Sequence, residues 1–209
     1  MTTVASMNLD ALQLALEQNL GNRLTPELAV GIIHAASQVR LSRIDVDQFD
    51  AQEYCGYSLQ CERIEDVIED VKPLHCRHWE ETEGYRHGVA LDPDYDYMVN
   101  AERTGRFMLF TVRTNGQLVG NCMMYLTQST HTRKWIAEED TIFIDKEHRK
   151  GRIGIKLIQY VERVLATLGV TEIRVTVKTV NRVGDLLQAL GYQHTANQLI
   201  KVLGEAHVQ

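Results

Sequence analysis

The stretch from Asp140 to Leu157 constrains the fold more than any other part of the chain. An apolar, β-rich run from Thr141 to Ile144 is followed by a polar turn, then by basic and glycine residues, and then by a long amphipathic pattern. This order predicts a strand, a loop and a helix. Gly151 and Gly154 let the backbone approach a ligand closely, and the first amides of the helix would point at the same place. The stretch therefore predicts a nest of amides that binds phosphate.

Three cations surround the predicted nest. Arg149, Lys150 and Arg152 would add to the positive end of the helix dipole, so a pyrophosphate is a natural guest. The same residues would also suit an ordinary loop with a solvated charged rim, and the loop alone does not decide between the two. Two other phosphate-loop patterns do not occur, because the sequence has no Gly-x-x-x-x-Gly-Lys-Ser/Thr and no Gly-x-Gly-x-x-Gly after a strand.

This loop resembles the Arg/Gln-x-x-Gly-x-Gly/Ala signature of the GNAT superfamily, the acyl-CoA-dependent N-acetyltransferases. In that family the loop amides hold the pyrophosphate of coenzyme A. The resemblance implies this role for Arg149, Lys150, Gly151, Arg152, Ile153 and Gly154. Arg152 stands where the family usually has its first glycine, and Gly151 lies one place early, so we expect a slightly different loop shape. Leu190-Gly191-Tyr192 also resembles the Leu-Gly-Phe/Tyr that closes the family's penultimate helix, and the resemblance covers about residues 57–203.

The composition fits one soluble globular core with a small extension. The chain has 209 residues and a net charge of -6, which argues against nucleic-acid binding and agrees mildly with a cationic acceptor. No apolar run approaches the roughly 20 residues that cross a bilayer, and the N-terminus lacks the pattern of a signal peptide. We therefore expect a cytoplasmic protein with no membrane span, whose four cysteines are reduced thiols.

Two amphipathic helices are expected at the start of the chain. From Asn8 to Leu20, leucines recur at helical spacing, and a glycine follows. Thr25 and Pro26 fit an N-cap and a first helical residue, which open a second helix to about residue 39. The two helices would form a hairpin in an extension of residues 1–50. We expect this extension to cover the catalytic domain, with a subunit contact as the alternative.

Residues 51–209 are predicted to form the catalytic domain. A helical pattern starts at Glu65, and Pro73 should break or kink it. Asn115-Gly116 predicts a tight turn in the clearest β-hairpin of the chain. The fold class expected from the resemblance is α/β (α+β), with a GNAT-like mixed central sheet flanked by helices and preceded by the N-terminal hairpin. The expected strands lie at 57–64, 107–112, 118–126, 135–144, 173–178 and 198–203, and the other helices at 95–103, 154–168 and 181–190.

The strand before the loop is expected to hold the acyl donor. In the GNAT family this strand splays from its neighbour, which leaves backbone groups for the pantetheine arm of acetyl-CoA. The resemblance therefore implies backbone contacts from Ile142, Phe143 and Ile144, whose side chains would also suit ordinary core packing. Asn181, at the start of the closing helix, is another position at which the family often contacts the cofactor.

Acetyl transfer to an amine also needs a group that takes the amine proton. Glu138-Glu139-Asp140 offers three carboxylates at the start of the strand, and strand alternation puts Glu139 on the face opposite to the other two. We favour Asp140 as the general base, because it lies nearest the apolar part of the strand, where desolvation would raise its pKa, with Glu139 second. A solvated acidic strand end is the plain alternative for each of them.

A general acid for the departing thiolate is missing at its usual place. Many family members use a tyrosine four residues before the closing glycine, and Leu187 occupies that position. Tyr125 or Tyr97 could act from elsewhere in the fold. Transfer without a dedicated acid is also possible, because the CoA thiolate is a tolerable leaving group.

Four residues are candidates for acceptor binding in the GNAT layout: His78, Trp79, Glu80 and His131. The plain alternative for the first three is a kinked helix that packs Trp79. His75 and His78 share a helix face, as zinc ligands do, but the sequence offers no second pair to complete a tetrahedral site, so we expect no metal. More narrowly, His78-Trp79-Glu80, the Asp140 strand and the short closing helix resemble GNAT proteins encoded by tailed bacteriophages.

The predicted function is an acyl-CoA-dependent N-acetyltransferase. It would move an acetyl group from acetyl-CoA to an amine by direct attack in a ternary complex. The alternative is a catalytically weak or inactive acyl-CoA-binding or assembly module, which the missing tyrosine and the irregular loop would suit. The sequence does not identify the amine acceptor, which is a small molecule or a protein. Members of the GNAT family are often dimers, so the resemblance implies a homodimer as one possible assembly of this chain.

Overall fold

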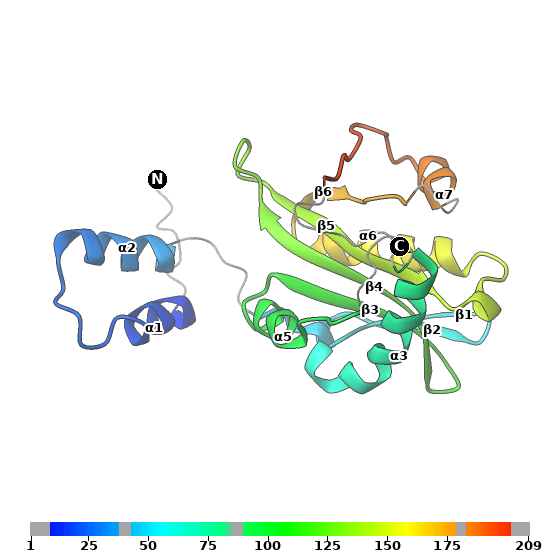
Figure 1. The fold of residues 1–209 in the computed structure, drawn as a ribbon, viewed down its shortest axis with the longest axis horizontal. Helices are drawn as coiled ribbons and strands as arrows, with labels where there is room; N and C mark the ends of the chain where they lie inside the picture. The colour runs from blue at the N-terminus through cyan, green and yellow to red at the C-terminus, as the bar shows by residue number, and fades with distance from the viewer. Residues whose placement is uncertain (1–8, 38–42, 83, 85–89, 179–182, 202–209) are drawn as a thin grey trace.

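The main body of the protein is a six-stranded sheet with helices on both faces (Figure 1). The computed structural model describes residues 9–37, 43–82, 84, 90–178 and 183–201. The strands are β1 (Gln52–Tyr54), β2 (Tyr57–Glu62), β3 (Phe107–Thr114), β4 (Gln117–Gln128), β5 (Trp135–Ile144) and β6 (Val170–Arg174), in that spatial order. Neighbouring strands are antiparallel except for β5 and β6, which are parallel. The mixed sheet expected from the sequence is confirmed.

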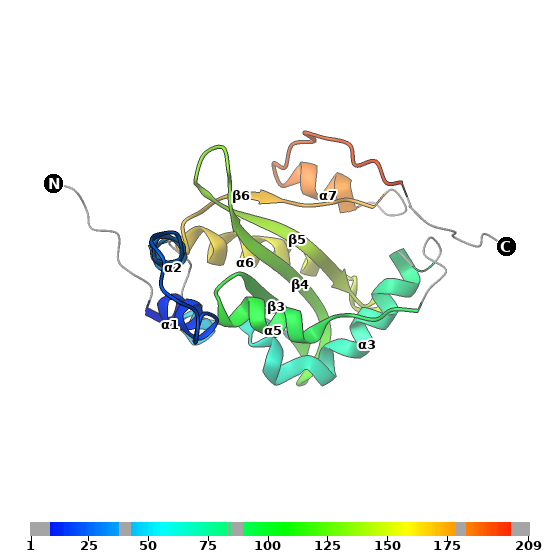
Figure 2. The same cartoon turned by 60° about the vertical axis from the view of Figure 1, so that its left-hand side comes forward.

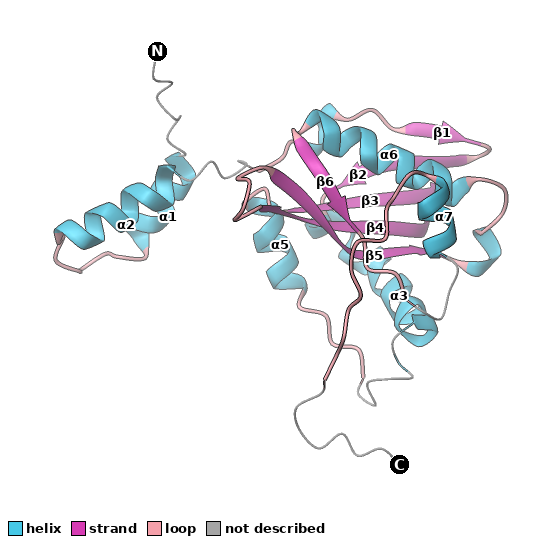
Figure 3. Cartoon of the chain, turned by 90° about the horizontal axis from the view of Figure 1, so that it is seen from above, coloured by secondary structure: helices cyan, strands magenta, loops and turns pink. Residues whose placement is uncertain are grey.

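The helices of the main body form one layer on each side of this sheet, as Figure 3 shows from above. They are α3 (Ile64–Thr82), α5 (Tyr95–Arg103), α6 (Ile153–Thr167) and α7 (Val183–Ala189), with short 3-10 turns η1 (Val46–Gln48) and η2 (Lys146–His148). Met108 and Phe110 of β3 pack in the core with α6, whereas Phe107 and Leu109 pack in the core with α3 and α5. Alternate side chains of a strand point to opposite faces, so one apolar run serves both cores.

Tight turns place the central strands as the sequence predicts. Asn115 and Gly116 both have positive φ, at 50° and 79°, and they join β3 to β4 in the expected hairpin. The helix α3 continues through Pro73 instead of ending there. Figure 2 shows that its second half turns away from the first, which is the kink expected where proline removes a backbone donor.

The C-terminal part differs from the expectation. The strand expected at 173–178 is β6, which ends at Arg174, and the strand expected at 198–203 does not form in its described residues, 198–201. No described strand pairs with that segment, and Leu199 and Ile200 stay 94% and 61% exposed. An extended segment without a partner lacks the ladder that defines a strand.

The N-terminal hairpin consists of α1 (Leu9–Glu17) and α2 (Pro26–Ser37). Thr25 caps α2 as predicted, because its hydroxyl accepts from the amide of Leu28 at 3.2 Å. Figures 1 and 3 show the hairpin beside the main body, and its role as a cover or a subunit contact stays a prediction. Its large exposed apolar side chains are Leu16, Leu20, Leu24, Val30 and Ile33. No helix in the described ranges is both long and apolar enough to cross a membrane.

The strands β4 and β5 approach each other closely at Gly120, near the end of β5. A Cβ atom at this position would lie 2.9 Å from Cγ1 of Ile144 and 3.0 Å from the carbonyl oxygen of Phe143. We expect Gly120→Ala to lower the free energy of unfolding by about 1–3 kcal/mol, because backbone cannot move aside as a side chain can. Urea unfolding followed by circular dichroism measures the change.

Gly31→Ala is the matched control, because an added Cβ there meets nothing within 4 Å. Alanine favours a helix over glycine by up to about 1 kcal/mol, so this variant should be as stable as the parent or slightly more so. Equal stability of the Gly120→Ala variant and the parent would show that the two strands are less tightly opposed than the structure indicates.

Candidate active site

The strand β5 departs from both of its neighbours near its middle. On the β4 side, Met124 faces Glu139 while Met123 faces Thr141, which leaves Asp140 as the extra residue of a β-bulge. On the other side, the ladder with β6 ends at Glu138, and the two strands separate beyond it. The splay expected for the strand before the loop is therefore present, and the second half of β5 has an open edge among the described strands.

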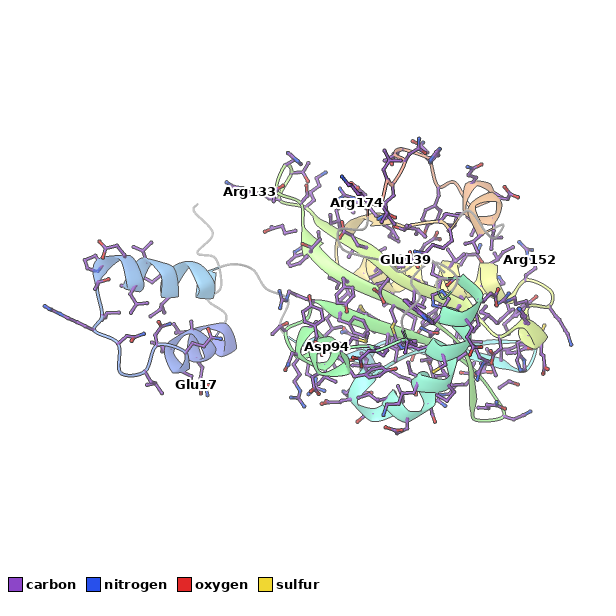
Figure 4. The ribbon with its side chains drawn as sticks, viewed as in Figure 1. Glu17, Asp94, Arg133, Glu139, Arg152 and Arg174 are labelled. Carbon is purple, nitrogen blue, oxygen red and sulfur yellow. The ribbon has the colours of Figure 1, made fainter. Side chains whose placement is uncertain are left out.

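A cavity of about 260 Å³ lies where the two strands separate. Its walls come from α3, the segment before α5, the second half of β5 and the segment after β6. Figure 4 shows Glu139 near the centre of the main body, above Asp94 and α5. The predicted site residues that line the cavity are His78, Trp79, Glu139, Asp140 and Ile142.

The bulge brings two consecutive carboxylates to one cavity. Strand alternation predicts that Glu139 and Asp140 lie on opposite faces, but both residues line this cavity. The extra residue of the bulge shifts the alternation by one, so both residues line the same space. Glu138 instead lies outside the cavity wall and pairs with Arg174, with Nη1 of Arg174 3.2 Å from Oε1.

Glu139 is the carboxylate with the environment of a base. Its Oε2 accepts a hydrogen bond from the backbone amide of Thr176 at 3.1 Å. Burial raises the pKa of Glu139 to about 7, and the amide of Thr176 opposes that rise while the charge of Asp140 adds to it. Asp140 is exposed, and the hydroxyl of Thr141 donates to its Oδ2 at 3.2 Å. The desolvation that we expected at Asp140 therefore falls on Glu139.

The helix α3 supplies the aromatic wall of the cavity. The ring of His78 lies 5.2 Å from the ring of Phe143, centroid to centroid, and Trp79 lines the cavity next to it. His75 also lines the cavity, although its spacing from His78 in the sequence suggests only a zinc ligand. Burial lowers the pKa of His75 to about 4, and its Nδ1 lies 3.0 Å from the hydroxyl of Tyr95, so this imidazole is neutral near pH 7.

Two of the acceptor candidates lie elsewhere. Glu80 lines a second hollow of about 570 Å³ between the end of α3 and the loop before α6. His131 is exposed in the turn between β4 and β5, and Figure 4 places the neighbouring Arg133 at the tip of that turn, apart from Glu139. A helix turns by about 100° per residue, so three consecutive residues of α3 cannot all face one cavity. Among the described residues, no group of three or more His, Cys, Asp or Glu could hold a metal ion.

No tyrosine of the described residues lines the cavity. Leu187, at the place of the family's usual acid, is buried in α7. The rings of Tyr97 and Tyr125 lie 6.0 Å apart, and Tyr97 is 55% exposed. Burial raises the pKa of Tyr125, with a contribution from the charge of Asp140, so its hydroxyl stays protonated near this carboxylate.

The loop before α6 presents a run of unpaired amides. Gly151 has a positive φ of 63°, and α6 begins two residues later at Ile153. The first backbone bond of the helix is donated by Lys156 to the carbonyl of Arg152, at 2.9 Å. The amides of residues 151–155 have no acceptor within the parts of the chain that the structure describes. These donors, at the positive end of a helix dipole, lie where the sequence predicts the nest.

The three basic residues of the loop do not form one ring of cations. Lys150 and Arg152 are exposed, and Figure 4 places Arg152 at the outer edge of the main body. Arg149 donates through Nη1 and Nη2 to the carboxylate of Glu81, at 2.7 and 2.8 Å. Of the other predicted cofactor residues, Phe143 and Ile144 are buried in the two cores, and Asn181 lies outside the described residues.

A family model and solved structures relate this chain to known proteins. The sequence model of the acetyltransferase (GNAT) family matches residues 68–192. No curated relative matches the chain by sequence. An aminoglycoside acetyltransferase from an uncultured soil metagenomic sample, solved in complex with sisomicin, is 14% identical with a TM-score of 0.58, over 71% of this chain and 97% of that one.

Two further solved structures share the fold. A ribosomal-protein-alanine N-acetyltransferase from Brucella melitensis biovar Abortus 2308 is 16% identical with a TM-score of 0.56, over 71% of this chain and 99% of that one. A predicted acetyltransferase from Clostridium acetobutylicum, solved with acetyl-CoA, is 14% identical with a TM-score of 0.57, over 72% and 99%. At this identity the structures support the fold alone.

The raised pKa of Glu139 predicts a pH-dependent cost to stability. Its pKa is about 7 in the folded protein and ordinarily 4.5, so the folded state binds this proton more tightly than the unfolded state does. The resulting contribution to the free energy of unfolding is full below pH 4.5 and is lost as the pH rises through 7. Relative to the parent, Glu139→Gln should gain up to about 3 kcal/mol in free energy of unfolding over that interval. Urea unfolding at a series of pH values measures this difference.

Glu138→Gln, which removes an exposed carboxylate from the same strand, is the control for this experiment. An unchanged difference between the parent and Glu139→Gln from pH 4.5 to 7 would contradict the assignment. The same would follow if both glutamine variants showed an equal gain.

Proposed function

Because this chain belongs to the GNAT acetyltransferase family, we propose that it transfers an acetyl group from acetyl-CoA to an amine by direct attack in a ternary complex. One observation carries the proposal. The cavity that holds Glu139 and Asp140 borders the open edge of β5, and β5 leads directly into the loop of unpaired amides. A site for a negatively charged donor and a site for a cationic acceptor therefore lie along one strand.

The residues of the loop fit the pyrophosphate of coenzyme A. The amides of residues 151–155 are unpaired donors, and Gly151 holds the positive φ that this geometry requires. A Cβ atom at Gly154 would meet only Cδ2 of Leu186, at 3.8 Å, so the approach to the nest is open at this point. Lys150 and Arg152 would add exposed positive charge at the rim, and backbone groups on the open edge of β5 around Ile142 would bind the pantetheine arm.

Glu139 is proposed as the general base. With a pKa of about 7, a large share of its carboxylate is ionised at neutral pH and can accept a proton from the attacking amine, directly or through water. The amide of Thr176 holds the carboxylate in place. The exposed Asp140 would attract the protonated acceptor and keep the pKa of Glu139 high, so the order of preference from the sequence is reversed.

Acetyl-CoA would supply the activated acyl group as a thioester and take up the electron pair on its sulfur as the carbonyl–sulfur bond breaks. We propose that no tyrosine protonates this sulfur, because Leu187 stands at the usual place and no described tyrosine lines the cavity. The same observation favours the second candidate, a catalytically weak acyl-CoA-binding module. The two differ in whether CoA is released when amines are offered.

The cofactor site is tested by isothermal titration of acetyl-CoA and CoA into the protein. We expect micromolar binding, and Gly154→Glu should weaken it at least tenfold because a carboxylate would fill and charge the nest. Gly31→Glu, on the exposed side of α2, is the matched control and should bind normally. If the parent protein bound neither ligand, the transferase proposal would be wrong.

The base is tested by release of free thiol from acetyl-CoA over a panel of amines. With the best acceptor, Glu139→Gln should lower kcat by about 10²–10⁴-fold and leave the Kd of acetyl-CoA unchanged. The parent rate should rise with pH to a plateau above about 7, as Glu139 loses its proton. Asp140→Asn should have a smaller effect and should shift that rise to lower pH. An unaltered kcat in Glu139→Gln would exclude this residue as the base.

A further inference from the structure

Two bidentate ion pairs join the last turns of α3 to the loop before α6. Nε and Nη2 of Arg77 donate to the two carboxylate oxygens of Asp145, at 2.6 and 2.8 Å. One helical turn later, Glu81 accepts from Nη1 and Nη2 of Arg149, at 2.7 and 2.8 Å. Bidentate pairs fix orientation as well as distance. We call these four residues the α3–loop clamp.

The clamp is partly shielded and has a further anchor. The side chains of Asp145 and Glu81 are only 17% and 24% exposed, so their attraction to the arginines is screened less than that of a fully exposed pair. Nε of Arg149 also donates to the carbonyl of Ile144 at 2.6 Å, and its guanidinium lies 5.1 Å from the centre of the Phe143 ring. Arg149 is thus bound to α3, to the end of β5 and to an aromatic face.

The clamp has opposite charges on each side. On α3 the order is a cation, Arg77, then an anion, Glu81, and on the loop it is an anion, Asp145, then a cation, Arg149. A loop shifted by one pair would place like charges together. The arrangement therefore specifies one position of the loop relative to the helix.

The same turn of α3 lines the candidate acceptor cavity. His78 and Trp79 lie between Arg77 and Glu81 in the sequence and face the cavity beside Glu139. A helical turn moves as a unit, because its backbone bonds tie each residue to the next turn. A change in the position of the loop would therefore be carried to the cavity wall through the clamp.

We propose that Arg77 and Glu81 are positioning residues that couple occupation of the loop amides to the shape of the acceptor cavity. This inference rests on the proposed function, because it takes the loop as the pyrophosphate site. Neither residue lines the acceptor cavity. A diphosphate at the loop amides favours one position of the loop. Through the clamp, that position of the loop fixes the position of the turn of α3 that carries His78 and Trp79. By linkage, an acceptor in the cavity favours donor binding to the same extent.

Trp79 allows a test that needs no known acceptor. The chain has two tryptophans, so Trp135→Phe leaves Trp79 as the sole tryptophan, which excitation beyond the tyrosine absorption band observes alone. The probe is adenosine 3′-phosphate 5′-diphosphate, the nucleotide end of CoA, which lacks the pantetheine arm and so cannot extend along β5. We expect saturable binding by calorimetry and a saturable change in Trp79 emission.

In this background, Glu81→Gln should lose at least half of the emission change at saturating nucleotide, while the Kd changes less than tenfold. Arg77→Gln should behave alike, which gives a second variant if one of them folds poorly by circular dichroism. Glu69→Gln is the control, because it removes a carboxylate from another ion pair of α3, with Lys72, and should keep the full response. Arg77→Glu combined with Asp145→Arg should restore the response that either change alone reduces.

The outcomes separate this inference from the proposed function. If the parent bound neither CoA nor the nucleotide, both would be wrong. If the nucleotide bound to the parent without a change in Trp79 emission, only the coupling would be overturned. The coupling would likewise be overturned if the clamp variants kept the full emission change at saturation.

Discussion

At Asp140 the strand β5 carries one residue more than the part of β4 that faces it, and much of the candidate site depends on this single insertion. The bulge places Glu139 and Asp140 along one cavity. Just before it the ladder with β6 ends, so the strand is paired on both sides in its first half and on one side in its second half. A continuous ladder would satisfy more backbone groups, but it would leave no open edge for a ligand.

Burial of Glu139 lowers the stability of the folded protein when this carboxylate is ionised. A half-buried carboxylate is destabilised when ionised, and the amide of Thr176 offsets only part of that cost, so Glu139 holds a proton far more tightly than an exposed glutamate does. A carboxylate poised in this way is a better proton acceptor near neutral pH than one with its ordinary pKa. His75 in the wall formed by α3 is buried without charge, so this side chain does not repel a cation.

Local patterns in the sequence predict most of the fold. Asn115-Gly116 marks the central hairpin, Thr25 marks the start of α2, and the glycine-containing loop marks the nest, because each of these depends on residues adjacent in the chain. The bulge at Asp140 has no such mark, since any strand residue can be the extra one. The sequence predicts a place for Arg149 at the nest, but its partner, Glu81, is 68 residues away in the sequence and is brought near only by the fold. The strand expected at 198–203 is wrong in its described residues for a similar reason. A local sequence pattern can suit a strand without showing whether another strand lies beside it.

The pairing of Arg149 also affects how acetylation of the protein's own lysines would change the loop. Since this side chain pairs with Glu81, the proposed pyrophosphate site would attract an anion mainly through backbone amides and the helix dipole, with Lys150 and Arg152 as exposed accessory charges. Acetylation of Lys150 would remove one charge from the rim and leave all of those amides in place. A phosphate site built from main-chain groups is in this sense resistant to self-modification, whereas one built from lysines would not be.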